Sequence, residues 1–195
     1  MKRVEARITA DQALQWLMEG NKKFCEEHYD VHPTMSEIKE LVAGQHPFAA
    51  IVSCADSRVP PNEIFDCDLG EIFVVRTAGN VVGEFELGSI EYAVDHLGCP
   101  LVMVLGHKNC GAVAGASTWT GGTGALAAIM DEVMPSMRRA RAEAADIAGA
   151  ISLAELYNVE NSIRRLKESK CLNALPEGAV VGAMYDIATG RVEVL

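Results

Sequence analysis

The chain has 195 residues, of which 49% are apolar and 23% are charged, as in an average globular protein. A chain of this length folds as one domain and buries about 70% of its unfolded surface without needing disulfides. Its 27 acidic residues outnumber 17 basic ones, and the resulting charge of −10 argues against a nucleic-acid or anionic-membrane partner. We expect one domain over residues 1–195, with an N-terminal helical arm over 1–44 and an α/β core over 45–195.

Two helices are expected in the arm. Thr9 and Gln12 have the spacing of a capping box, and apolar residues then recur at helical intervals, which predicts a helix within residues 9–28. A second capping box, Thr34 with Glu37, opens a shorter helical pattern that Gly44 is placed to end. Both helices have the pattern of ordinary packing helices, and neither is assigned any chemistry.

The core alternates between strands and helices. Four short apolar runs are typical of strands buried on both faces, over residues 48–53, 72–75, 101–105 and 179–184. Helical patterns over 87–98, 126–133 and 153–166 separate the later runs, which favours right-handed crossovers and parallel pairing. Residues 191–195 alternate in polarity after a turn signal. The predicted fold is α/β, with a mostly parallel central sheet of four strands, an antiparallel edge strand, flanking helices and the N-terminal helical arm.

Two of the predicted strands end in residues that can carry chemistry. The first strand runs into Cys54, Asp56 and Arg58, and the third runs into His107 and Cys110. Ligands of parallel sheets bind at the carboxyl ends of the strands, so these residues should open on the same side of the sheet. They are therefore the first candidates for a functional site.

Two thiolates and one imidazole form a ligand set that suits Zn²⁺. The HxxC spacing is expected to place His107 and Cys110 on the first turn of a helix, whose positive end favours a thiolate. Three ligands leave a fourth position for water, which is the arrangement of a catalytic zinc. Asp56 either fills that position or stands beside it, where Arg58 can hold it ionised by a bidentate pair.

Each feature alone has a simpler explanation. An isolated HxxC is a weak metal signal, and an isolated cysteine at a strand end is more often a small buried hydrophobe. Asp56 and Arg58 alone would usually be a loop ion pair. A zinc site is favoured because the simpler explanations would have to coincide at two strand ends.

The other four cysteines are expected to be structural thiols: Cys25, Cys67, Cys99 and Cys171. Residues 1–10 lack the apolar core of a signal peptide, and no apolar run is long enough to span a bilayer. A chain of this kind more often holds reduced thiols or a metal than disulfides, so a cytoplasmic location is expected.

Around the candidate zinc site, in the segments that contain Cys54, His107 and Cys110, the chain resembles the β-class carbonic anhydrases. The resemblance rests on CADSRVPPNEIFD (54–66), GEIFVVRTAGNVV (70–82), ELGSIEYAVDHLG (86–98) and GHKNCGAV (106–113), with matching order and spacing. It implies reversible hydration of carbon dioxide to bicarbonate, the lyase activity called carbonate dehydratase, on one zinc ion per subunit. By the same resemblance, Cys54, His107 and Cys110 are zinc ligands and Asp56 with Arg58 is the catalytic dyad. Asp56 itself binds zinc in the closed state of some members.

The resemblance also implies the residues of a substrate pocket: Gln45, Phe73, Ala78, Tyr92 and Gly111. The bicarbonate-inhibited subclass has a tryptophan three residues before the first cysteine, and this chain has Ile51 there, which favours the plant-like, open-site subclass. Ala78 replaces a common valine and Lys108 a commonly small residue, so the shape of the pocket can differ.

Family members are dimers in which the partner completes each pocket, so a homodimer or dimer of dimers is expected, with the helix of residues 9–28 reaching the partner. Two alternatives share the zinc site: hydrolysis of carbonyl sulfide or carbon disulfide, and a non-catalytic zinc protein. Nucleotide binding is less favoured, because no phosphate-binding glycine pattern follows a predicted strand.

Overall fold

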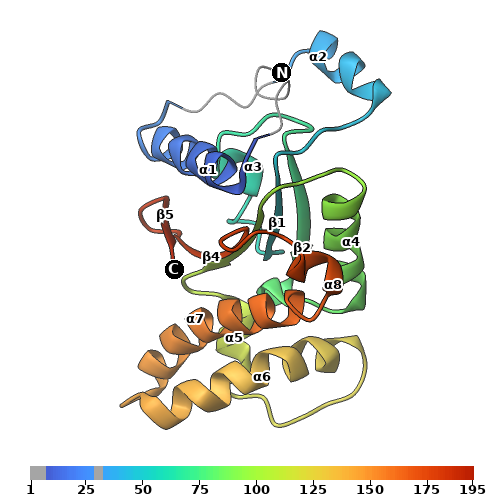
Figure 1. Ribbon diagram of the computed structural model, residues 1–195. Helices are drawn as coiled ribbons and strands as arrows, with labels where there is room; N and C mark the ends of the chain where they lie inside the picture. Colours follow the sequence, from blue (N-terminus) through green and yellow to red (C-terminus); the bar gives the residue numbers. More distant parts are fainter. Residues whose placement is uncertain (1–7, 29–32) are drawn as a thin grey trace.

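The computed structural model describes residues 8–28 and 33–195, and the expectations for residues 1–7 and 29–32 fall outside this described part (Figure 1). The strands are β1 (Ala49–Cys54), β2 (Ile72–Thr77), β3 (Val102–His107), β4 (Val180–Asp186) and β5 (Arg191–Val194). The α-helices are α1 (Ala10–Cys25), α2 (Met35–Glu40), α3 (Pro61–Ile64), α4 (Glu84–Asp95), α5 (Gly111–Ala116), α6 (Ala125–Glu143), α7 (Ile147–Leu166) and α8 (Lys170–Asn173). Two 3-10 turns are η1 (Leu41–Ala43) and η2 (Ala78–Asn80).

All five strands join one sheet in the order β2-β1-β3-β4-β5. The first four strands pair in parallel, and β5 pairs antiparallel with β4 at the edge. The predicted fold class is confirmed. The strand order places β1 and β3 side by side, so their carboxyl ends are neighbours.

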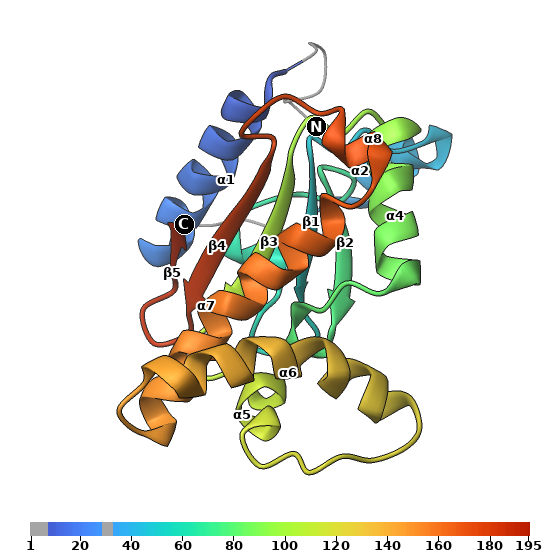
Figure 2. The same ribbon diagram turned by 60° about the horizontal axis from the view of Figure 1, so that its bottom comes forward.

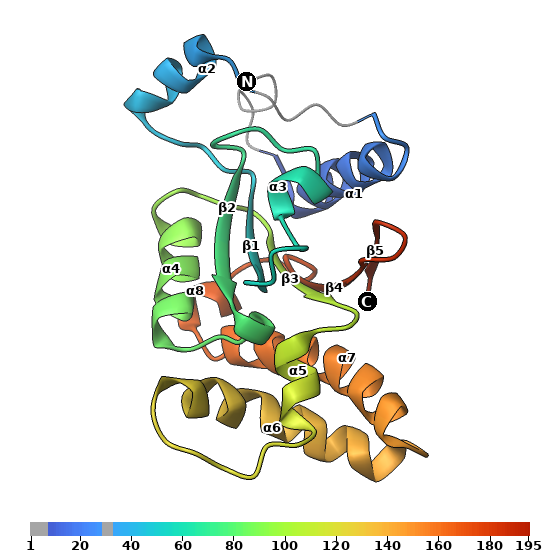
Figure 3. The same cartoon turned by 180° about the vertical axis from the view of Figure 1, so that it is seen from behind.

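The apolar runs are continuous because both faces of the sheet are covered. Ala49 and Ile51 of β1 belong to the core cluster that includes α1, whereas Ala50 and Val52 belong to the cluster that includes α4 and α7. Figure 2 shows α7 crossing one face of the sheet and α1 at the left, beside β4 and β5. Beyond the carboxyl ends of the strands, α5 and α6 form a third layer with its own core (Figures 1 and 3).

Helix α1 packs against the sheet of its own chain. Ala13 and Leu17 are fully buried in the core. The buried Asn21 amide donates to the Ile64 and Gly190 carbonyls, and its oxygen accepts from the Val192 N–H. The apolar face of α1 is thus used within the chain, and the expectation that residues 9–28 reach a partner subunit stays a prediction.

No helix in the described ranges is long and apolar enough to cross a membrane.

Helix α2, by contrast with α1, has no buried residue and projects from the top of the molecule in Figure 1.

Candidate metal centre

Three potential metal ligands meet at the carboxyl ends of β1 and β3. Cys54 is the last residue of β1, His107 is the last residue of β3, and Cys110 is the N-cap of α5. Their ligand atoms all lie within 4.8 Å of one another. Each residue is at most 3% exposed, so the group is closed off from bulk water by the layers around it.

The local structure corrects one expectation, since His107 is not on a helix. Strand β3 continues through His107, which pairs with Tyr185 of β4. The chain then turns through Asn109, whose φ of 59° is left-handed, and α5 begins only at Gly111. An asparagine tolerates this conformation better than most residues, which allows the strand to end and the helix to begin within three residues. The HxxC spacing thus spans a tight strand-to-helix turn.

The histidine ring is oriented for metal binding. Its Nδ1 lies 3.0 Å from the carbonyl oxygen of Lys108, so Nδ1 carries the proton and donates it. The other nitrogen, Nε2, is buried and has no hydrogen-bond partner in the described part of the chain. An orphaned buried acceptor of this kind is normally explained by an ion or water. A backbone acceptor on the far nitrogen is also the usual way of orienting a metal-bound histidine.

The two thiols have the electrostatics of a ligand pair. Cys54 Sγ lies 3.9 Å from Cys110 Sγ and accepts N–H donors from Asp56 at 3.4 Å and Gly79 at 3.3 Å. The hydrogen bond from Cys110, together with these N–H groups, lowers the pKa of the Cys54 thiol, while the same bond and burial raise the pKa of Cys110. The pair thus shares a proton that a divalent cation can displace.

Asp56 lies beside the triad and outside it. The Arg58 guanidinium donates from Nε to Oδ1 at 2.9 Å and from Nη2 to Oδ2 at 2.6 Å, and the Arg58 backbone N–H adds a third bond. The side-chain hydrogen bond to Arg58 holds the pKa of Asp56 well below its usual range. Both oxygens of Asp56 are therefore engaged, and the cluster of possible ligands contains Cys54, His107 and Cys110 without it.

A second arginine, which the sequence patterns did not single out, fixes the same loop. Arg76 donates from Nε to the Cys54 carbonyl at 3.0 Å and from Nη2 to the Asp56 carbonyl at 2.6 Å. A signal was present, because Arg58 and Arg76 are the only basic residues, beside nine acidic ones, between residues 54 and 96. Both of them hold the loop that follows β1.

The predicted pocket residues divide into two groups. Gly111 follows Cys110 directly, and Ala78 precedes Gly79, whose N–H donates to Cys54. Gln45, Phe73 and Tyr92 lie toward the other end of the sheet.

Gln45 lies before the amino end of β1, and β1 itself runs about 16 Å from Ala49 to Cys54 at about 3.3 Å per residue. Phe73 pairs with Ala50 near the start of β1, and its ring lies 6.3 Å from that of Tyr92, which is 48% exposed. Within one chain these three residues do not reach the triad.

Three further polar residues of α7 contact the centre and were missed. Glu155, Asn158 and Ser162 are all buried, and they bond to the backbone of Cys110, Gly79 and Asn80 respectively. In the sequence they stand directly beside the apolar positions of the helix. That placement is the signal that could have indicated a buried polar stripe.

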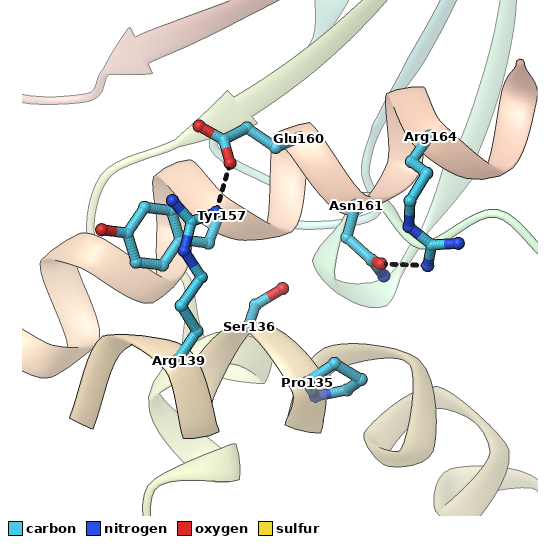
Figure 4. A pocket seen from close by; sticks show the side chains of 7 residues that line it. All are labelled: Pro135, Ser136, Arg139, Tyr157, Glu160, Asn161 and Arg164. Atoms are coloured by element: carbon cyan, nitrogen blue, oxygen red, sulfur yellow. Dashed lines mark hydrogen bonds and ion pairs between the residues drawn. The ribbon is translucent and has the colours of Figure 1, made fainter. Parts of the chain in front are cut away.

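A separate small pocket lies between α6 and α7 (Figure 4). Its two guanidinium groups are already paired, Arg139 with Glu160 at 2.6 Å and Arg164 with Glu168 at 3.0 Å. Arg139 also stacks over the Tyr157 ring. With its cations satisfied by neighbouring carboxylates, this pocket offers no unpaired charge to a ligand.

Known proteins resemble the chain in sequence and in fold. The sequence model of the carbonic anhydrase family matches residues 49–192. "Carbonic anhydrase 2" of Mycobacterium tuberculosis (strain ATCC 25618 / H37Rv) is 40% identical over 185 residues, covering 90% of this chain and 87% of that protein.

Among solved structures, a tetrameric β-carbonic anhydrase of Sordaria macrospora aligns with a TM-score of 0.74 and 27% identity, covering 95% of this chain and 93% of that one. The Coccomyxa β-carbonic anhydrase in complex with acetazolamide aligns with a TM-score of 0.73 and 28% identity, covering 93% and 86%.

Proposed function

The chain belongs to the carbonic anhydrase family, in its β class, and from this premise we propose the role of each residue in the centre. The protein is a zinc enzyme, a lyase that reversibly hydrates carbon dioxide to bicarbonate and a proton. Its relatives and structural neighbours are named carbonic anhydrases. Hydrolysis of carbonyl sulfide or carbon disulfide, or a purely structural zinc, is therefore not favoured.

We propose that Cys54, His107 and Cys110 hold the zinc ion. The observation that carries this assignment is the buried, unpartnered Nε2 of His107 among two thiols, with the proton on the other ring nitrogen. Zinc with three protein ligands supplies an acidified water, with a pKa of roughly 7, as the nucleophile. The chain contributes a buried site and two thiols, of which Cys54 has a lowered pKa.

Asp56 is proposed to orient the reacting water. Its carboxylate stays ionised because of Arg58, and its backbone N–H contacts the sulfur of Cys54, so it stands next to the ligand triad. An ionised carboxylate in this place accepts a hydrogen bond from the water and aims the oxygen at carbon dioxide. While Arg58 engages both of its oxygens, Asp56 would stay outside the set of metal ligands.

The substrate pocket is proposed to be completed by a second copy of the chain. Gln45, Phe73 and Tyr92 belong to the family's pocket by resemblance but lie far from the triad of their own chain. Tyr92 is half-exposed and Gln45 is exposed, so both are available to a neighbour. We therefore propose a homodimer or a dimer of dimers in which Gln45 of one subunit donates to a substrate oxygen in the other.

The subclass and location are also proposals. The Asp56–Arg58 pair and Ile51 at the position of the diagnostic tryptophan support the plant-like, open-site type. All six cysteines are free of disulfides, which supports a reducing compartment such as the cytoplasm.

Stopped-flow carbon dioxide hydration, on protein whose zinc content has been measured, tests the proposal. We expect one zinc per chain and activity that rises with pH as the zinc-bound water loses its proton. A fully zinc-loaded protein without hydration activity would contradict the catalytic assignment, and active protein free of zinc would contradict the ligand assignment.

A further inference from the structure

We propose that one face of α7, formed by Glu155, Asn158 and Ser162, positions both thiol ligands by holding the backbone behind them. This inference rests on the proposed zinc role of Cys54 and Cys110. The three side chains are positioning residues, because none of them is among the possible metal ligands.

The three residues form one buried polar stripe. They are 5%, 1% and 2% exposed, and their spacing of three and then four residues aligns them on the same side of the helix. Helix α7 contacts β3, α5 and the turn η2, and Figure 2 shows it crossing in front of the sheet. The stripe therefore faces the loops that carry the ligands.

Glu155 holds the loop of Cys110. Its Oε1 accepts the backbone N–H of Cys110 at 2.9 Å, across 45 residues of sequence. Cys110 is the N-cap residue of α5, so its own N–H has no partner within that helix. A carboxylate acceptor gives a charge-assisted bond, which fixes the direction of the Cys110 backbone and hence the position of its Sγ.

Asn158 and Ser162 hold the turn that contacts Cys54. Asn158 Nδ2 donates to the Gly79 carbonyl at 2.5 Å, and Ser162 Oγ donates to the Asn80 carbonyl at 2.9 Å. Gly79 and Asn80 both have left-handed φ, of 71° and 45°. The Gly79 N–H in turn donates to Cys54 Sγ. The two α7 side chains thus stabilise a turn whose conformation aims an N–H at a thiol ligand.

Stability alone does not account for this stripe. Asn158 Oδ1 and Asn80 Nδ2 are buried without partners in the described part of the chain, and a buried polar atom without a partner destabilises a fold. Apolar side chains at these positions would avoid that cost. Retaining the amide is understandable if its bond to the Gly79 carbonyl is needed to shape the ligand site.

The chain offers a matched control on the neighbouring helix. Ser136 of α6 is 3% exposed, like Ser162, and its hydroxyl has no hydrogen-bond partner in the described ranges (Figure 4). Ser136→Ala and Ser162→Ala remove the same atom from comparable burial. Only Ser162→Ala removes a bond to the turn behind Cys54.

The experiment measures how fast zinc leaves the holoenzyme when an excess of a chromophoric chelator is added. Changes in the groups that orient ligands typically weaken metal binding by 10–100-fold, so we expect about 10-fold faster release for Ser162→Ala and a larger increase for Asn158→Leu. Glu155→Leu should behave like Asn158→Leu, and Glu155→Gln, which keeps an acceptor oxygen, should restore slow release. Ser136→Ala should release zinc at the wild-type rate.

A second measurement uses cobalt in place of zinc. A general loss of packing would not change the absorption spectrum of the bound cobalt. The thiolate-to-cobalt charge-transfer band should shift or weaken in Asn158→Leu and Ser162→Ala, and stay unchanged in Ser136→Ala. Thermal melting of the metal-free proteins identifies any variant that does not fold, and Ser162→Ala still tests the proposal if Asn158→Leu fails.

Wild-type release rates and cobalt spectra in folded Ser162→Ala and Glu155→Leu would overturn the positioning role. Equal effects of Ser136→Ala and Ser162→Ala would overturn it as well. If the wild-type protein binds no zinc, the proposed metal centre itself fails, and this result is distinct from the others.

Discussion

The two ends of the central sheet differ in how much of their structure one chain provides. At the carboxyl end, the proposed ligands Cys54, His107 and Cys110 are buried, and hydrogen bonds from several elements hold the loops around them. At the amino end, Gln45 and Tyr92 are exposed, and the Tyr92 ring lies 6.3 Å from that of Phe73 and 5.2 Å from that of His96.

This difference separates metal binding from substrate recognition. At the carboxyl end, hydrogen bonds within the chain orient the candidate ligands, and the one unpartnered ligand atom, His107 Nε2 in the described part of the chain, is left for a metal. The exposed side chains at the amino end are available to contact a second subunit. Changes at the carboxyl end should therefore affect zinc and chemistry, whereas changes at the amino end should affect activity without affecting zinc.

The largest effect is expected for Cys110→Ser. A serine hydroxyl is a poor zinc ligand, so the variant should lose bound zinc, and its carbon dioxide hydration should fall to the uncatalysed level. Metal analysis and stopped-flow hydration measure the two losses. Cys99→Ser is the control, because Cys99 is an equally buried thiol away from the triad. Full zinc and full activity in Cys110→Ser would contradict the claim that the carboxyl end of the sheet holds the metal through Cys110.

Asp56→Asn should reduce turnover by about 100-fold while one zinc per chain remains bound, since misplacing a reacting group costs about 100-fold. The amide keeps the size of the side chain but loses the charge that orients the water. Asp66→Asn is a matched control, because Asp66 also pairs with a cation, Lys23, at 2.7 Å. Zinc analysis and kcat measurements test this prediction. Wild-type turnover in Asp56→Asn would show that the orienting role assigned to Asp56 is wrong.

A mixed-subunit experiment tests the amino end. Gln45→Ala should lower kcat by roughly 10-fold or more, at unchanged zinc content, because one donor to the developing charge is lost. Mixing it with inactive Cys110→Ser should restore activity, since one site of each mixed dimer then combines an intact metal centre with an intact Gln45. No recovery in subunits shown to exchange would contradict the shared pocket.

The smallest expected effect is on stability. Arg58 depresses the pKa of Asp56, so the pair stabilises the fold above the unfolded-state pKa, about 3.9, and this contribution is lost as the pH falls through the folded-state value. We expect metal-free Asp56→Asn to be about 1 kcal/mol less stable than wild type at pH 7, and the gap to narrow below pH 4. Urea unfolding at several pH values measures it, and a gap that widens in acid would contradict the sign.

Much of the fold could be predicted because its signals are local. Runs of apolar residues such as 101–105 identify buried strands without knowledge of their neighbours, and capping boxes such as Thr9 with Gln12 mark helix starts. The ligand types were also readable, since soft sulfur and imidazole nitrogen determine which metal is favoured wherever the chain places them.

Only the tertiary structure decided how those residues are used. The order β2-β1-β3 brings Cys54 beside His107, and no local pattern specifies that β1 rather than β2 neighbours β3. The bonds from Arg76, Glu155 and Asn158 join backbone groups 20 to 80 residues away, so their partners exist only after folding. The sequence by itself determined the strands, the candidate metal ligands and the charged pair. Tertiary packing decided which hydrogen-bond partners each residue has, because a hydrogen bond depends on distance in space and not on distance along the chain.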